Sequence, residues 1–257
     1  MSASTLALDL AAALDPVVLA RRMGFEPDGW QARVLRSPKA QVILNCSRQV
    51  GKSTVTGILA SHTGLYDAGA PILLLSPTER QRVELLRKVR GTLAALGTDA
   101  AEIERDNALS LELANGSRIL ALPGKEGTIR GFSGVRLLVI DEAARVPDAL
   151  YQAVRPMLAV SGGRIVLLSS PFGKRGFFHH EWTEGGPDWE RVEVAAYQCP
   201  RIGKAWLDKE RATIGDWWFE QEYLCRFKET TDQVFGYDEV MGALSADVAP
   251  LFPLEGT

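Results

Sequence analysis

The sequence predicts an α/β fold in which helices flank a mostly parallel central sheet, and three observations support this prediction. Short apolar segments recur at 42–44, 71–76, 137–140 and 164–168, as expected of strands that are buried on both faces of a parallel sheet. Segments with helical periodicity lie between them. Polar residues directly follow several of these apolar segments, at the strand ends where open parallel sheets bind ligands.

The segment 41–54 joins the first apolar strand to a helical pattern, and we interpret it as a P-loop. The backbone amides of such a turn, together with the helix N-terminus, attract phosphate. Lys52 is then placed on the β- and γ-phosphates of a nucleotide, and the Ser53 hydroxyl on Mg²⁺. The full pattern G-x-x-x-x-G-K-[ST] has glycine where this chain has Cys46, so a surface Gly-Lys turn remains the alternative. The predicted nucleotide-binding residues of the loop are Ser47, Arg48, Gln49, Val50, Gly51, Lys52, Ser53 and Thr54.

The composition is that of an ordinary globular protein, with 257 residues, 46% of them hydrophobic and 24% charged. The 29 Lys and Arg against 32 Asp and Glu give a net charge of −3, so any DNA contact must come from a local basic face. The three cysteines form no C-x-x-C, which indicates a reduced setting and no zinc site. The sequence shows no apolar run of membrane-spanning length and no basic start of a signal peptide. We therefore expect a protein that is neither membrane-bound nor exported.

The N-terminal part predicts a helix and then an adenine contact. The segment 5–22 has Leu6, Leu10 and Leu14 on one helical face. Trp30 and Gln31 follow, shortly before the P-loop. A glutamine amide offers both a donor and an acceptor, which suits N6 and N7 of adenine, and the aromatic neighbour can stack or pack. The alternative is a helix-capping Trp-Gln pair that binds no ligand.

The middle of the chain contains a basic helix and a hairpin. The segment 78–96 predicts a helix with one leucine-rich face. Asn115-Gly116, centred in the alternating segment 109–122, predicts a β-hairpin. The other face of the predicted helix is either a DNA-facing surface or a solvated exterior; its basic residues are Arg80, Arg87, Lys88 and Arg90.

The C-terminal half gives coarser predictions. The segment 147–158 predicts a helix with proline in its first turn, and 189–197 predicts an edge strand. The aromatic segment 201–227 predicts helices whose rings pack in a core rather than stack on bases. The periodicity after Phe227 is weak, which predicts a linker or a tail.

Asp141 and Glu142 end the apolar segment 137–140 and supply the acidic groups that phosphoryl transfer to water needs. We predict that Ser53 and Asp141 hold Mg²⁺ and that Glu142 orients and deprotonates the attacking water. Two arginines are candidates to stabilise the transition state. Arg48 lies in the P-loop and is placed to reach the γ-phosphate in cis, whereas Arg130 lies in the glycine-rich loop before the acidic segment, unless it is only a surface arginine. An arginine supplied by another subunit would make activity depend on assembly.

Several segments together resemble the ATPase domain of the large terminase subunit, the DNA-packaging motor of tailed bacteriophages. The resemblance covers roughly residues 24–227, and the S-R-Q-x-G-K-[ST] form of the loop is typical of that family. The segments are Cys-Ser-Arg-Gln-Val-Gly-Lys-Ser-Thr at 46–54, Ile-Arg-Gly-Phe-Ser-Gly at 129–134, Leu-Val-Ile-Asp-Glu-Ala-Ala at 138–144, Ser-Ser-Pro at 169–171 and Phe-Glu-Gln-Glu-Tyr-Leu-Cys-Arg-Phe at 219–227.

The resemblance implies an additional-strand, RecA-like P-loop NTPase with a small helical C-terminal subdomain. We expect an N-terminal helix and adenine-side loop at 1–30, the ATPase core at 31–200, and the subdomain with its linker or tail at 201–257. Asp141 and Glu142 match the family's Walker B pair, Arg48 its P-loop arginine and Arg130 its trans-acting arginine finger. The motif that couples hydrolysis to DNA movement is matched by Ser169, Ser170 and Pro171.

The resemblance also implies the activity, which is ATP hydrolysis that drives double-stranded viral DNA into a preformed capsid, with ATP and Mg²⁺ as the cofactors. The implied partners are double-stranded DNA, the small terminase subunit, and further copies of the chain in a ring, commonly of five subunits, on a portal. The implied location is the cytoplasm of an infected bacterial host. Large terminases usually carry a second, nuclease domain. Thirty residues (257 − 227) follow Phe227, which are too few for such a domain, so we expect no DNA cleavage by this chain. A helicase and a nucleotide-binding assembly module without turnover are the alternative functions.

Overall fold

The computed structural model describes residues 3–97, 103–123, 131–229 and 242–243. Within them the strands form one eight-stranded sheet in the order β3-β4-β5-β2-β6-β7-β1-β8. The four predicted buried strands are all present in it. The strands are β1 (Gln41–Cys46), β2 (Pro71–Ser76), β3 (Ile103–Asn107), β4 (Ser110–Leu113), β5 (Arg118–Pro123), β6 (Leu137–Asp141), β7 (Arg164–Ser169) and β8 (Trp189–Val194).

The sheet is mostly parallel, as predicted. The strands from β5 through β2, β6, β7 and β1 to β8 pair in parallel, whereas β4 is antiparallel to both β3 and β5. Strand β7 lies between β1, which leads into the P-loop, and β6, which ends in Asp141. This inserted strand is the additional strand of the RecA-like arrangement.

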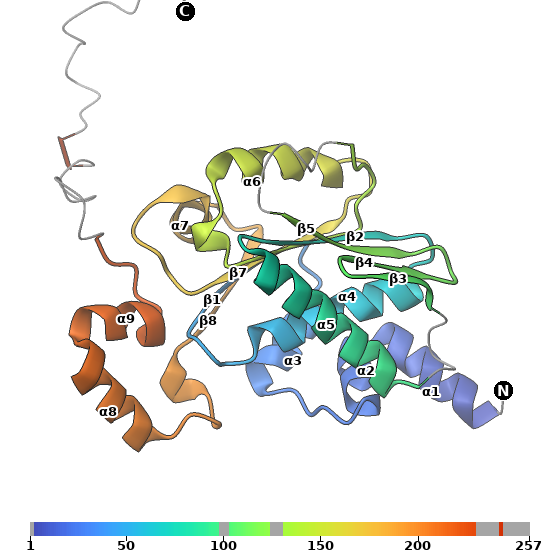
Figure 1. Cartoon of the computed structure of the whole chain (residues 1–257), viewed down its shortest axis with the longest axis horizontal. Coiled ribbons are helices and arrows are strands. Elements are labelled where there is room, and N and C mark those ends of the chain that lie inside the picture. The colour runs from blue at the N-terminus through green and yellow to red at the C-terminus, as the bar shows by residue number, and fades with distance from the viewer. Residues whose placement is uncertain (1–2, 98–102, 124–130, 230–241, 244–257) are drawn as a thin grey trace, which may run out of the picture.

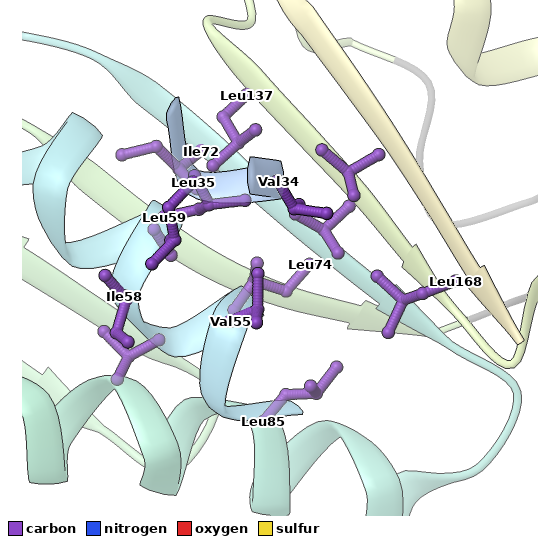
Figure 2. Packing of buried hydrophobic residues seen from close by; sticks show 14 of the residues in the cluster. Val34, Leu35, Val55, Ile58, Leu59, Ile72, Leu74, Leu85, Leu137 and Leu168 are labelled. Atoms are coloured by element: carbon purple, nitrogen blue, oxygen red, sulfur yellow. The ribbon is translucent and has the colours of Figure 1, made fainter. Parts of the chain in front are cut away.

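Helices cover both faces of the sheet (Figure 1). On one face lie α2 (Pro16–Arg22), α3 (Gly29–Arg36), α4 (Lys52–Tyr66) and α5 (Glu79–Ala95). Figure 2 shows how Val55, Ile58 and Leu59 of α4 pack with Leu74 of β2 and Leu168 of β7 in the larger core cluster. A close approach of α5 to α4 depends on Gly57, because a Cβ there would lie 3.3 Å from backbone atoms of Lys88.

The opposite face carries α6 (Asp148–Val154) and α7 (Gly176–Thr183) (Figure 1). Their side chains form a second core cluster with Ile43, Leu73 and Ile140, from the other face of the sheet. Burial on both faces explains why β1, β2 and β6 read as continuous apolar runs in the sequence.

A helical pair follows β8: α8 (Lys204–Ile214) and α9 (Asp216–Leu224). Phe219 and Tyr223 pack with Leu207 in a small core of their own. The prediction that the aromatic residues of this segment are core was wrong for Trp206 and Trp218, which are about half exposed. The Trp206 ring packs edge-on against Tyr223 at the rim of this core, with ring centres 5.8 Å apart, and the Trp218 ring packs against Trp217, at 4.6 Å.

The predicted helix at 5–22 is two helices, α1 (Ala3–Leu14) and α2. Asp15 interrupts it, because its extended backbone and its carboxylate cap the start of α2, with Pro16 in the first turn. The three leucines that were predicted to share one helical face, Leu6, Leu10 and Leu14, are exposed. Helix α1 attaches instead through polar contacts, including His62 Nε2 with the carbonyl oxygen of Ala12 at 3.1 Å.

Other predictions were confirmed with small changes. The hairpin turns at Asn115-Gly116, with Gly116 at φ 82°, and the strand predicted at 189–197 is the edge strand β8. The helix predicted at 147–158 is α6 followed by a 3₁₀ turn, Arg155–Leu158. Most of the segment after Phe227 lies outside the described residues, and none of the described helices is long and apolar enough to cross a membrane.

Candidate nucleotide-binding site

The predicted phosphate-binding and acidic residues meet at one edge of the sheet. Strands β1, β6 and β7 are parallel and adjacent, so the P-loop, Asp141 and Ser169 all follow carboxyl ends of neighbouring strands. The P-loop and Asp141 line a cavity of about 420 Å³, and Ser169 is buried outside its lining. Its lining residues are Arg48, Gln49, Gly51, Lys52, Ser53, Thr54, Glu84, Lys88, Asp141 and Glu142.

The loop has the backbone of an anion-binding turn. Gly51 has φ 98° and caps the N-terminus of α4 without a side-chain bond, so the first amides of α4 keep their N–H groups available for phosphate. Gln49 is also in the left-handed region, at φ 62°. Lys52 Nζ donates to the carbonyl oxygens of Cys46 at 3.2 Å and Ser47 at 2.9 Å, which holds the ammonium group inside the curve of the loop.

The acidic pair lies opposite the loop. Asp141 is 7% exposed, and its burial, reinforced by the charge of Glu142, raises its pKa to about 7. Glu142 has a left-handed backbone, φ 51° and ψ 42°, which turns its side chain into the same cavity as Lys52. A buried carboxylate beside a second carboxylate is stabilised by a cation, and a carboxylate with a hydroxyl matches the oxygen ligands that Mg²⁺ takes, so Asp141 and Ser53 fit that ion.

Arg48 is turned towards the helical pair. Its Nε donates to Glu222 Oε2 at 2.6 Å, and this bond raises the pKa of the Arg48 guanidinium. Glu222 belongs to α9 and is 8% exposed. The arginine predicted to reach the γ-phosphate is therefore paired with a carboxylate of helix α9, although it still lines the cavity.

Glu222 connects several predicted parts of the site. Its Oε2 also accepts from Ser170 Oγ at 3.1 Å, and its Oε1 accepts from Arg145 Nη2 at 3.3 Å. Ser170 and Ser169 are buried at the end of β7, and the Ser169 hydroxyl has no hydrogen-bond partner among the described residues. Pro171, the third residue of the predicted coupling motif, is buried beside them.

The predicted adenine contacts have mixed roles. Gln31 is 1% exposed, and its Oε1 accepts from the Asp28 backbone N–H at 2.8 Å. This is the capping role that was the alternative prediction. Its Nε2 faces the P-loop, because a Cβ on Gly51 would lie 2.7 Å from it. Trp30 is partly buried against the larger core, and its indole nitrogen has no partner among the described residues.

Arg201 is a part of the site that the sequence reasoning missed. Its Nη2 donates to the Val50 carbonyl at 2.9 Å, and its guanidinium pairs with Asp28 at 2.7 Å. The carbonyl and the next N–H point in opposite directions in a trans peptide. A hydrogen bond on the Val50 oxygen therefore fixes the peptide that carries the Gly51 N–H.

The basic residues of α5 have different neighbours. Lys88 lines the nucleotide cavity with Glu84. Arg87 pairs with Glu84 at 2.8 Å, and Arg90 pairs with Asp106 at 2.7 Å. Arg80 is exposed. Lys88 is also exposed, so its position at the nucleotide cavity does not contradict the predicted basic face, and DNA contact by these residues stays a prediction.

Arg130, the predicted arginine finger, lies outside the described residues. The next described residue is Gly131, whose φ is 122°. Phe132 then packs against the second core cluster, on the face of the sheet that carries α6 and α7.

The sequence profile of the N-terminal part of the T4-like type of terminase large subunit matches residues 43–240. The chain belongs to this family. The terminase large subunit of Thermus phage G20c is 24% identical over an alignment of 248 residues, and the match covers 83% of this chain and 51% of that protein. The chain therefore spans about half the length of the curated relatives that it matches.

Solved structures of terminases have the same fold as this family member. The large terminase ATPase domain of Thermus phage P74-26 superimposes with a TM-score of 0.71 at 22% identity, covering 81% of this chain and 97% of that one. The large terminase of HK97 bacteriophage gives 0.64 at 13% identity, covering 79% and 51%. A large terminase from a thermophilic bacteriophage, in complex with ADP, gives 0.63 at 15% identity, covering 78% and 54%.

Proposed function

We propose that this chain is the ATPase part of a terminase large subunit, which hydrolyses ATP to drive double-stranded viral DNA into a preformed capsid. The observation that carries the proposal is the single cavity shared by Lys52, Ser53, Asp141 and Glu142. Phosphoryl transfer to water needs phosphate binding, a metal site and a group that orients the nucleophile. Together these four residues can meet all three requirements.

The chain's own residues have separate roles in this proposal. Lys52 and the amides at the start of α4 bind the phosphates, and Glu142 orients the attacking water and accepts its proton. Asp141 and Ser53 would hold Mg²⁺, which offsets charge on the phosphates when it is bound. Arg48 and Arg130 are the candidates to stabilise the transition state, in cis and from a neighbouring subunit respectively.

The first experiment measures steady-state ATP hydrolysis per subunit against protein concentration, with and without double-stranded DNA. Lys52→Ala serves as the blank. Glu142→Gln keeps the volume and removes the base, so we expect nucleotide affinity to remain and turnover to fall by about 10²-fold or more. Unchanged turnover in Glu142→Gln would refute the catalytic assignment.

We also propose that the chain forms a ring, commonly of five subunits, on a portal with a small terminase subunit. The same assay tests whether a neighbouring subunit completes the site, as such a ring requires. A specific activity that rises with concentration and is lost in Arg130→Ala indicates a site completed by a neighbour. A low and flat activity that is lost in Arg48→Ala indicates catalysis within one subunit instead.

DNA contact is proposed for the exposed side of α5, with Arg80 and Arg87 as the leading residues. Each phosphate contact that is removed is expected to lower the salt dependence of DNA-stimulated hydrolysis by roughly one in the log–log slope. Lys88→Ala is the comparison, because this lysine lines the nucleotide cavity. Equal slopes in Arg80→Ala, Arg87→Ala and the unmodified protein would place the DNA elsewhere.

A further inference from the structure

Arg145 contacts three functional parts of the site at once. It belongs to the short 3₁₀ turn Ala143–Arg145, directly after the acidic pair. Its Nε lies 3.7 Å from Glu142 Oε2, and its Nη2 donates to Glu222 Oε1 at 3.3 Å. Its guanidinium carbon lies 4.1 Å from the centre of the Phe172 ring, which follows Ser170 and Pro171. One side chain thus joins the proposed base, helix α9 and the segment after β7.

The surroundings fix how Arg145 is oriented. A guanidinium stacked on an aromatic ring has its plane set by that ring, so its N–H groups point in defined directions. The arginine is 30% exposed, whereas the side chains that it pairs with are 21% exposed for Glu142 and 10% for Glu222. Partly desolvated charges interact more strongly than exposed ones, so a shift of either carboxylate alters the position of the shared cation.

Arg175 provides an internal comparison. It also stacks over Phe172, at 5.1 Å from the ring centre. It begins helix α7 as the residue before Gly176, and it does not line the nucleotide cavity. The two arginines therefore share the aromatic contact but differ in their contact with Glu142.

We propose that Arg145 is a positioning residue that sets the carboxylate of Glu142 according to the positions of α9 and of the segment 169–172. This inference rests on the proposed function, because it assumes that Glu142 is the base. When α9 and the segment 169–172 hold Glu222 and Phe172 as they are here, Arg145 keeps Glu142 beside the turn. When either moves, the guanidinium moves with it and changes where the Glu142 carboxylate points in the cavity.

The test compares Arg145→Ala and Arg145→Lys with Arg175→Ala as the matched control. Nucleotide affinity and kcat for steady-state ATP hydrolysis are measured for each. We expect Arg145→Ala to lower kcat by about tenfold or more while nucleotide affinity stays within about twofold, since the lost contact acts on the base and not on the phosphates. Arg175→Ala is expected to leave both within about twofold. Lysine can pair with one carboxylate but cannot stack as a plane, so Arg145→Lys should recover only part of kcat.

A double-mutant cycle with Glu222→Gln tests the link to α9. If Arg145 acts through Glu222, the effect of Arg145→Ala on kcat shrinks in the Glu222→Gln background. Independent, multiplying effects would overturn the inference. So would an equal kcat in Arg145→Ala and Arg175→Ala, or a loss of nucleotide affinity as large as the loss of kcat.

The failure of the inference is separable from that of the proposed function. If Glu142→Gln still hydrolyses ATP, the proposed base is wrong and the inference falls with it. If Glu142→Gln is inactive but Arg145→Ala turns over normally, only the inference is refuted. Should Arg145→Ala not fold, Arg145→Lys and Glu222→Gln carry the same comparison, and full kcat in both overturns the inference.

Discussion

Replacing Arg201 with alanine tests whether the P-loop is held from outside the nucleotide cavity. The change removes the hydrogen bond to the Val50 carbonyl and the ion pair with Asp28. In this ion pair the Arg201 side chain is 49% exposed and the Asp28 side chain 18% exposed. An ion pair this exposed contributes up to about 1 kcal/mol, and a hydrogen bond from a charged donor about 1.5–3 kcal/mol before its acceptor is rehydrated.

We therefore expect Arg201→Ala to lower the free energy of unfolding by about 1–3 kcal/mol, which corresponds to roughly 2–4 °C in Tm per kcal/mol for a domain of this size. The functional consequence is larger than for an ordinary surface pair. With the Val50 carbonyl free, the peptide that carries the Gly51 N–H is no longer fixed, and we expect nucleotide affinity to fall by about tenfold with kcat less affected.

The control is Arg33→Ala, because Arg33 also forms an exposed ion pair, with Glu190 at 2.8 Å, and does not line the nucleotide cavity. Thermal unfolding with and without ADP, together with ADP titration by calorimetry, measures both effects. A cycle with Asp28→Asn isolates the ion pair, for which we expect a coupling of about 1 kcal/mol or less. If Arg201→Ala binds ADP as tightly as Arg33→Ala, the role assigned to Arg201 is refuted.

Three further predictions concern the fold. Gly163→Ala should be strongly destabilising in chemical denaturation, because the new Cβ would lie 2.0 Å from the Val135 carbonyl oxygen. Leu74→Ala, at a position with 0% exposure, should lower the free energy of unfolding by about 2–5 kcal/mol without changing the m-value. The hydrogen bond from Arg36 holds the pKa of Asp15 below its usual value. At neutral pH we therefore expect Asp15→Asn to be less stable than the unmodified protein, and this difference in the free energy of unfolding should vanish as the pH falls through the lowered pKa.

Each of these predictions has a clear opposite result. A Gly163→Ala protein with unchanged stability would mean that the backbone around residue 163 is not packed as described. A cost below about 0.5 kcal/mol for Leu74→Ala would mean that the core closes around the missing atoms. A stability difference for Asp15→Asn that persists unchanged at pH 2 would exclude the ion pair as its cause, and because asparagine caps a helix as well as aspartate does, it would not come from the cap of α2 either.

The site was predictable from sequence where its residues are adjacent in the chain. Gly51, Lys52 and Ser53 are consecutive, and Asp141 and Glu142 end an apolar strand, so a local pattern contains the chemistry. The structure confirms that these two segments lie together at one edge of the sheet. The parallel strands that bring them there were also visible, as short apolar runs separated by helical periodicity.

The contacts that cross the chain could not be predicted in this way. Arg48 was expected to face the phosphate, but it pairs with Glu222, which lies 174 residues further along. The same holds for Arg201 and Asp28, 173 residues apart. No local motif marks the residues of either pair, and no spacing rule selects one carboxylate among 32 acidic residues as the partner of a given arginine.

The sequence by itself determined the α/β fold and the positions of the predicted P-loop and the acidic pair at strand ends, because buried strands and the turns that follow them leave local signatures in the chain. Only the tertiary structure decided which way Arg48 and Lys88 point, that Gln31 caps a helix, and that the leucines of α1 are exposed. The physical reason is that a side chain's direction depends on the helix packed against its own element. That packing is set by contacts such as Gly57 against Lys88, between residues distant in sequence.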